Sequence, residues 1–140
     1  MLKRAGHEVL WLDGIAAELS PEEFRARLLA FAPDCAVFET KTPVVKRHWR
    51  LFRELKPELP DCRFVLTGDH VTALPAESME ACPADAILTG GNWDFLLLNF
   101  AEANGDAAIG RLPPGYWTVS SGDDRRTFTV VVDPRTRRRV

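Results

Sequence analysis

Cysteine is scarce in this chain, and the placement of its three cysteines excludes several classes of protein. Cys35, Cys62 and Cys82 are odd in number, lie far apart, and each stands in or beside an apolar segment. This pattern lacks the paired spacing of a disulfide framework, a zinc site or an iron–sulfur motif. We therefore expect reduced thiols among apolar side chains.

Long apolar runs and charge of one sign are also missing. No apolar stretch is long enough to cross a bilayer, and the N-terminus lacks the apolar centre of a signal peptide. The net charge is only −2, and the one strongly basic stretch, residues 135–139, has no interleaved aromatic residues. The sequence therefore predicts a cytoplasmic protein with neither a membrane nor a nucleic acid among its partners.

What is present is the composition of an ordinary globular protein. The chain has 140 residues, of which 46% are hydrophobic and 27% charged, enough for one core. We divide it into a main domain over residues 1–105 and a C-terminal part over residues 106–140. The C-terminal part begins with a proline-rich linker and ends in the basic tail. Between them, apolar runs at 116–119 and 127–132 flank a turn at 122–124, which predicts a β-hairpin.

Four short apolar runs in the main domain are typical of strands that are covered on both faces, because their apolar residues are continuous rather than alternating. They lie at 9–12, 35–38, 64–67 and 86–89. Segments with a helical period separate or follow them. Strand and helix in alternation predict right-handed crossovers, and hence an α/β fold with a parallel sheet.

Capping signals mark where the helices begin. Ser20 and Glu23 predict a capping box around Pro21. A second helix is expected to begin at Thr42-Pro43, and a third at Asn92 or Asp94. The side chains expected to face the core are Phe24, Leu28 and Phe31 in the first helix, Val45, Trp49, Phe52 and Leu55 in the second, and Trp93, Leu96, Leu97 and Phe100 in the third.

Small and polar residues gather directly after the last three of these strands. In an open parallel sheet, ligands bind outside the carboxyl ends of the strands, where loops converge. This edge is therefore the candidate site. Its residues are Thr40, Lys41, Thr42, Pro43, Gly68, Asp69, His70, Val71, Thr72, Gly90 and Gly91.

Several of these residues have a structural interpretation as well as a functional one. Thr42 suits a helix N-cap as well as a ligand donor, and Gly90-Gly91 suits a tight corner as well as the close approach of a cofactor. His70 suits a turn, a cofactor contact or a metal ligand. Asp69 and His70 are adjacent, so their side chains diverge, and no nucleophile accompanies them. We therefore assign no catalytic residue and leave open whether the protein is an enzyme.

A series of short motifs stands in order along residues 1–103. They are Arg4-Ala5-Gly6-His7-Glu8-Val9, Ser20-Pro21-Glu22-Glu23, the Thr40 and Thr42-Pro43 turn, Gly68-Asp69-His70-Val71-Thr72-Ala73-Leu74-Pro75, and Gly90-Gly91. Together they resemble the N-terminal cobalamin-binding (B12-binding) domain of cobalamin-dependent radical SAM proteins. The stretch from Gly68 to Pro75 is the most specific of them.

The resemblance implies a flavodoxin-like (Rossmann-type), doubly wound parallel sheet with helices on both faces. It also implies a cobalamin over the strand carboxyl ends, contacted by residues 40–43, 68–72 and 90–91, with no protein histidine on the cobalt. Methyl transfer or radical chemistry would be done by an iron–sulfur cluster and S-adenosylmethionine in a separate radical SAM domain, in cis or in trans. The alternative is a cofactor-free domain that acts as an interaction or regulatory module.

One feature of the resembling family has no counterpart here. The family has an apolar strand before the motif at Arg4, and this chain starts after it. We therefore expect the strands at 9–12 and 35–38 either to pair directly or to leave a gap that another chain fills. A homo-oligomer that completes the sheet is one such arrangement.

Overall fold

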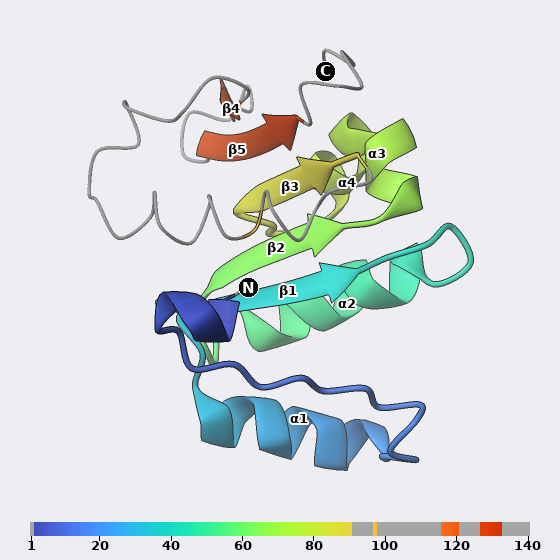
Figure 1. Cartoon of the computed structure of the whole chain (residues 1–140). Helices are drawn as coiled ribbons and strands as arrows, with labels where there is room; N and C mark the ends of the chain where they lie inside the picture. Colours follow the sequence, from blue (N-terminus) through green and yellow to red (C-terminus); the bar gives the residue numbers. More distant parts are fainter. Residues whose placement is uncertain (1, 91–96, 98–115, 121–126, 133–140) are drawn as a thin grey trace.

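The computed structural model describes residues 2–90, 97, 116–120 and 127–132 of the chain (Figure 1). Its elements are the 3-10 helix η1 (Leu2–Ala5), α1 (Pro21–Phe31), β1 (Cys35–Glu39), α2 (Val45–Leu55), β2 (Arg63–Thr67), α3 (Asp69–Ala73), α4 (Pro75–Ala81), β3 (Ala86–Thr89), β4 (Tyr116–Ser120) and β5 (Thr127–Val132).

The strands form one sheet in the order β1-β2-β3-β5-β4. The first four of these run parallel, and β4 runs antiparallel to β5. Val37 of β1 lies opposite Val65 of β2, and Leu66 lies opposite Ile87 of β3. This flavodoxin-like α/β architecture is the fold class that the sequence predicts.

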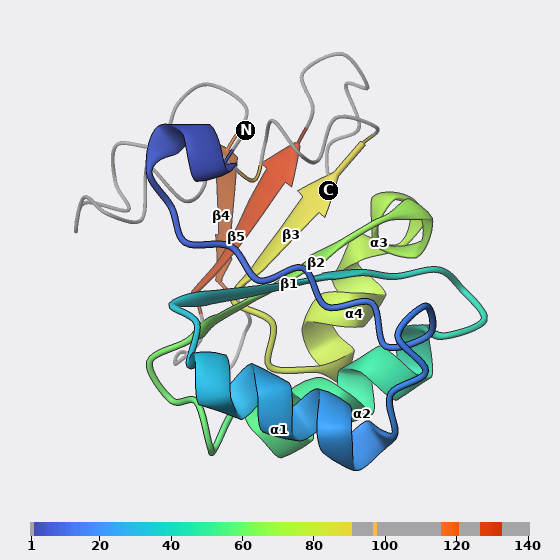
Figure 2. The same ribbon diagram turned by 60° about the horizontal axis from the view of Figure 1, so that its bottom comes forward.

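Apolar clusters cover both faces of the sheet because successive strand residues point to opposite sides. Phe64 and Leu66 of β2 face α1, α2 and α4, in a cluster centred on the fully buried Phe52. The intervening Val65 faces the other way, toward the helical residue Leu97. Figure 2 shows the described helices α1, α2 and α4 together below the sheet. Because the strands are buried on both faces, their residues in the sequence are apolar without interruption.

The first helix forms as its capping signals predict. The Ser20 hydroxyl accepts the backbone N–H of Glu23 at 3.1 Å, and the Glu23 carboxylate accepts the N–H of Ser20 at 2.8 Å. The backbone N–H of Ser20, and next its side chain, lower the pKa of the exposed Glu23 carboxyl, because they favour its charged form. The two bonds confirm the predicted capping box. Of the expected core stripe, Leu28 is buried and Phe24 packs against the core, whereas Phe31 is only partly buried and belongs to neither core cluster.

The second helix begins later than predicted. It starts at Val45, after a turn in which the Val44 N–H donates to the Lys41 carbonyl, and no side chain caps it. Thr42 is therefore not an N-cap. The predicted core face is confirmed by the buried residues Val45, Trp49, Phe52 and Leu55, while the basic residues Lys46, Arg47, Arg50 and Arg53 are exposed.

The predicted strand at residues 9–12 is wrong. The segment is extended but belongs to no strand of the described sheet. Leu10 is 40% exposed and Trp11 is 77% exposed, and only Leu12 packs against the main cluster. A strand exists only where a neighbour pairs with its backbone, and this segment has none among the described residues. The expected direct pairing with β1 is thus absent.

Several predictions fall largely on residues outside the described ranges. Of the third predicted helix, only Leu97 is described, and it is helical and buried. β4 and β5 pair antiparallel as expected for a hairpin, and β5 lies parallel to β3. The turn between them, residues 121–126, lies outside the described ranges, so the hairpin itself stays a prediction.

The three cysteines are reduced thiols and form no disulfide, as the sequence predicts. Cys62 and Cys82 are buried, and Cys35 is half-buried on β1. Burial raises the pKa of Cys35 to about 12 and that of Cys62 to about 11, because an apolar environment disfavours the thiolate. Within the described part of the chain, no helix is long and apolar enough to cross a bilayer.

Candidate functional site

The loops after β1 and β2 are joined by a close backbone contact. The Thr40 N–H donates to the Thr67 carbonyl at 2.7 Å and so extends the β1–β2 ladder by one bond. Gly68 follows with φ at +109°, and a Cβ there would lie 2.3 Å from the Thr40 carbonyl oxygen. A glycine is therefore required at position 68 by both conformation and space.

The loops after β2 and β3 are joined by Thr72. Its hydroxyl donates to the Gly68 carbonyl at 2.7 Å and accepts the N–H of Gly90 at 3.0 Å. Gly90 has φ at +98°, which supports the tight-corner interpretation of this position. Val71 is fully buried in the main cluster, and Gly91 lies outside the described residues.

His70 is turned into the protein rather than toward solvent. The residue is only 5% exposed, and its Nδ1 lies 3.2 Å from the Thr42 hydroxyl. Its Nε2 lies 3.3 Å from a carboxylate oxygen of Glu77, without the geometry of a directed hydrogen bond. The ring also packs edge-to-face on Trp49, with centroids 5.8 Å apart. The structure thus gives His70 a role in joining the loop after β1 to α4.

The remaining predicted residues form the outer surface of the same edge. Lys41, Pro43 and Asp69 are exposed, and Thr42 is exposed apart from its contact with His70. The structure therefore brings the three predicted loops together. Their inner residues are engaged in holding the edge, while the outer ones are open to a ligand.

Two hydroxyls at this edge are buried without a hydrogen-bond partner. They belong to Thr40, in the predicted set, and to Thr67, the last residue of β2, which the prediction missed. A buried polar atom without a partner carries a free-energy cost, so such atoms often mark a place that a ligand completes. A threonine that ends an otherwise apolar strand is the one sequence signal that could have pointed to Thr67.

These observations allow a test of the fit of a cobalamin to this edge. Unpartnered hydroxyls, closely approaching backbone and exposed polar residues suit a large cofactor held by its amides. His70 is only 5% exposed, with its Nδ1 on the Thr42 hydroxyl and its Nε2 beside the Glu77 carboxylate, so its ring is turned away from solvent. Within the described ranges, no three His, Cys, Asp or Glu side chains gather in a metal-binding cluster. The polar groups and close backbone of this edge are compatible with the amides and phosphate of such a cofactor.

Sequence reasoning missed the partners of His70. Glu77, whose carboxylate lies beside His70, is on α4, a helix that was not predicted. The next residue of that helix, Ser78, accepts the indole N–H of Trp49 at 3.2 Å, and the Trp49 ring packs on His70. These contacts join α2 to α4 across 29 residues of chain. No local pattern signals a contact of that kind, because it depends on how the two helices pack on the sheet.

His48 is a second histidine that sequence reasoning missed. Its ring packs edge-to-face on Phe38, with centroids 5.6 Å apart, and its buried Nδ1 has no hydrogen-bond partner. Burial lowers its pKa, and the neighbouring Arg47 charge lowers it further. The environment therefore favours the neutral imidazole.

Comparison with known proteins adds one distant relation. The chain is 25% identical over 103 residues to an anaerobic magnesium-protoporphyrin IX monomethyl ester cyclase of Rubrivivax gelatinosus. The match covers 73% of this chain but 19% of the cyclase, so the chain spans about a fifth of that relative's length. No family model matches the chain, and no solved structure matches it. The chain is thus a distant relative of part of a larger enzyme.

Proposed function

We propose that this chain is a cobalamin-binding domain that holds the cofactor over the carboxyl ends of β1, β2 and β3. The observation that carries the proposal is the convergence of the three predicted loops at one edge, with two buried hydroxyls left unpartnered. The order of the motifs along residues 1–103 supports it. So does the relation to an enzyme named as a cyclase of a tetrapyrrole, although the substrate of that enzyme is not carried over.

The outer residues of the edge would contact the cofactor. Thr42, Lys41 and Asp69 offer a hydroxyl, an ammonium and a carboxylate to its peripheral amides and its phosphate. Gly68 lets the loop after β2 lie against Thr40, and Gly90 turns the chain after β3 with a positive φ, so the loops stay close together where a ring would lie. His70 keeps the loops in place and stays off the metal.

Cobalamin, when bound, supplies a cobalt–carbon bond for methyl transfer or radical formation. This chain binds and orients the cofactor and shields one side of it from water. A radical SAM domain, in cis or in trans, would carry the iron–sulfur cluster and S-adenosylmethionine. The cyclase is about five times as long as the matched region, which is consistent with a domain that works beside others.

The test is a titration of the whole chain with hydroxocobalamin and with methylcobalamin, followed by visible absorbance. Two exposed aspartates at opposite ends of β2 make a matched pair of variants. Asp69→Arg places a bulky cation at the candidate site, and Asp61→Arg places it at the amino end of the strand. We expect saturable binding that Asp69→Arg weakens about tenfold and that Asp61→Arg leaves unchanged.

The absence of saturable binding by a chain with the circular dichroism of a folded α/β protein would contradict the proposal. Equal weakening by both variants would contradict the assignment of the site but not of the cofactor. A spectrum in which a histidine replaces the lower ligand of the cobalt would contradict the role given to His70.

The second candidate function is a cofactor-free interaction module. It is favoured by the way His70 finds its partners within the chain, in Thr42, Glu77 and Trp49. An edge that holds itself together needs no cofactor to be stable. A folded chain that binds neither cobalamin would support this candidate.

A further inference from the structure

The imidazole of His70 is held in one orientation by neighbours on three sides. Its Nδ1 lies 3.2 Å from the Thr42 hydroxyl oxygen, and its Nε2 lies 3.3 Å from a carboxylate oxygen of Glu77. The indole of Trp49 packs edge-to-face on the ring and is itself fixed by its hydrogen bond to Ser78. A ring turned over would present carbon atoms to both Thr42 and Glu77, so these contacts fix which nitrogen faces which group.

The Glu77 carboxylate decides which nitrogen of the neutral ring carries the proton. A carboxylate is only an acceptor, so it repels a lone pair on the nearby Nε2 of His70. It attracts an Nε2–H even where the bond is not well directed. The Thr42 hydroxyl can serve as donor or as acceptor. The contacts therefore favour the tautomer with the proton on Nε2 and a lone pair on Nδ1.

This tautomer sets the direction of the Thr42 hydroxyl. Because Nδ1 is then an acceptor, the hydroxyl donates its one proton to His70 and keeps only lone pairs. Within the described part of the chain, the Thr42 side chain forms no other hydrogen bond, and the residue is exposed. Thr42 thus offers an acceptor, and no donor, to a ligand.

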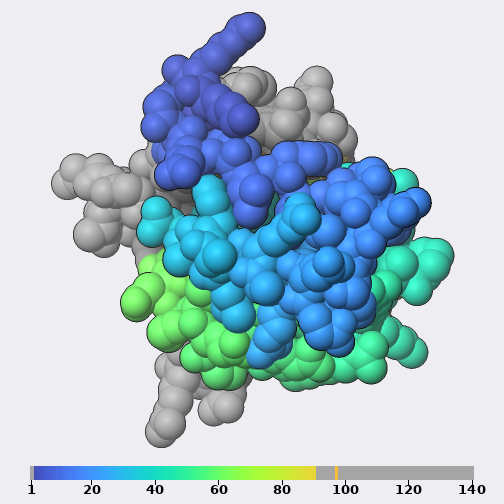
Figure 3. All heavy atoms as spheres, turned by 90° about the horizontal axis from the view of Figure 1, so that it is seen from below, coloured from blue at the N-terminus to red at the C-terminus, as the bar shows by residue number. Residues whose placement is uncertain are grey.

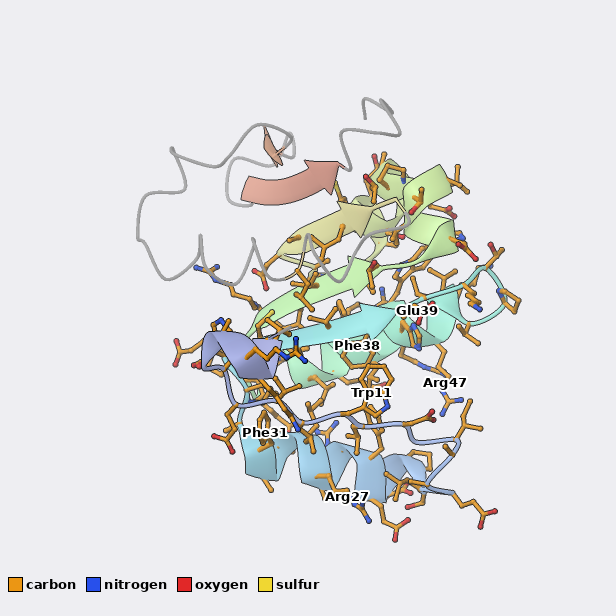
Figure 4. The ribbon with its side chains drawn as sticks, in the orientation of Figure 1. Trp11, Arg27, Phe31, Phe38, Glu39 and Arg47 are labelled. Carbon is orange, nitrogen blue, oxygen red and sulfur yellow. The ribbon has the colours of Figure 1, made fainter. Side chains whose placement is uncertain are left out.

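The loop that carries this acceptor is open at the candidate edge. It runs between Glu39, the last residue of β1, and Arg47, in the first turn of α2, and Figure 4 shows both near the carboxyl end of β1. Seen from the α1 side, the start of α2 projects beyond α1 at that end of the molecule (Figure 3). A ligand at this edge can therefore reach the Thr42 oxygen.

We propose that Glu77 and His70 are positioning residues that make Thr42 an acceptor, so that Thr42 binds an N–H donor of the ligand rather than an anionic oxygen. This inference rests on the proposed function, in which the donor is a primary amide on the rim of the corrin and not the phosphate of the nucleotide. The ammonium of the exposed Lys41, which only donates, is the group that suits the phosphate.

The first measurement is the tautomer of His70 in the free chain. It is read by NMR from the nitrogen resonances of the ring at mildly alkaline pH, where an unperturbed histidine is neutral. We expect the proton on Nε2. Glu77→Lys replaces an acceptor by a group that only donates, so it should move the proton to Nδ1.

Glu80→Lys is the matched control for this measurement. It makes the same change of charge about one turn further along α4, and it should leave the tautomer unchanged. Both glutamates are exposed, so both variants should fold.

The second measurement is the affinity of the whole chain for hydroxocobalamin and for cobinamide, which keeps the corrin amides but lacks the nucleotide and its phosphate. Thr42→Val removes the acceptor, and Glu77→Lys turns the hydroxyl into a donor. Each should weaken the binding of both ligands about tenfold. Thr42→Ser keeps the hydroxyl and should bind both ligands as the unaltered chain does, and so should Glu80→Lys.

Several results would overturn the inference. One is a proton on Nδ1 of His70 in the unaltered chain, and another is a tautomer that Glu77→Lys leaves unchanged. If Thr42→Val weakened the binding of hydroxocobalamin but not of cobinamide, Thr42 would contact the nucleotide or its phosphate rather than a corrin amide. If the folded chain bound neither ligand, the proposed function and the amide contact would both be wrong, and the tautomer in the free chain would separately decide the positioning role of Glu77.

Discussion

Gly68 shows how much of the candidate site depends on the absence of one carbon atom. Its φ of +109° is a conformation that other residues rarely adopt, and its Cα faces the Thr40 carbonyl at a distance that leaves no room for a Cβ. The same glycine accepts the Thr72 hydroxyl through its carbonyl and so supports the loop after β3. Gly68 is thus constrained in three ways: by its φ, by its close approach to Thr40 and by the hydrogen bond that its carbonyl accepts from Thr72.

Replacement of Gly68 by alanine should therefore destabilise the fold by about 3 kcal/mol, with loss of any ligand binding at this edge. Gly6→Ala is the matched control, because Gly6 also has a positive φ, of +92°, but no atom lies within 4 Å of a Cβ built there. Gly6→Ala should lower the free energy of unfolding by about 1 kcal/mol. Urea unfolding of the two variants separates the steric clash, which only Gly68→Ala creates, from the backbone strain that both variants share. Equal losses of the free energy of unfolding in the two variants would contradict this account.

Helix α1 shows an element whose beginning is decided locally. Ser20 and Glu23 satisfy two backbone N–H groups that no helical carbonyl could reach, and Pro21 needs no such partner. Helix α2 has no side-chain cap, and the Thr42-Pro43 signal that precedes it does not mark its first residue. Its start is decided by the turn after β1, in which Val44 bonds to Lys41 and Thr42 is drawn toward His70.

Ser20→Ala should consequently lower the free energy of unfolding by about 1 kcal/mol, because the N–H of Glu23 loses its acceptor. Glu22→Ala changes an exposed residue of the same turn that takes no part in the capping box, and it should have a much smaller effect. Thermal unfolding followed by circular dichroism tests this, with a decrease in Tm of roughly 4 °C expected for Ser20→Ala. Similar decreases for both variants would show that the box contributes little.

The molecule as a whole encloses its thiols in a two-sided core. Cys62 and Cys82 belong to the cluster on the α1 and α2 side, and Cys35 packs against the cluster on the other side. The raised pKa of Cys35, to about 12, and of Cys62, to about 11, leaves almost no thiolate at neutral pH. Since the thiolate is the nucleophile, both thiols react slowly because they stay neutral, and burial slows their reaction further.

At pH 8, labelling of the three native thiols by a disulfide reagent should therefore be slow and should accelerate with urea in parallel with global unfolding. The unfolded chain, with thiol pKa values near about 8.5, should react fully within the mixing time of a manual experiment. Ala30→Cys on the exposed face of α1 serves as the control and should react rapidly in the native state. Rapid labelling of Cys35 alone would show that the β1 edge opens without the rest of the sheet.

The sequence by itself determined the features that depend on neighbouring residues. Continuous apolar runs identified β1, β2 and β3, helical spacing identified the buried faces of α1 and α2, and the capping box set the start of α1. The rule that parallel strands gather their carboxyl ends then placed the candidate loops at one edge.

Tertiary structure decided what depends on distant contacts. The run at 9–12 has the composition of a strand, but no described neighbour pairs with it, so it stays an unpaired segment with Trp11 exposed. His70 was open to several roles until the packing of α4 and α2 gave it Glu77 and Trp49 as neighbours. The physical reason is that apolar periodicity and caps act within a few residues, whereas backbone pairing and buried polar contacts require groups that the chain brings together only when it folds.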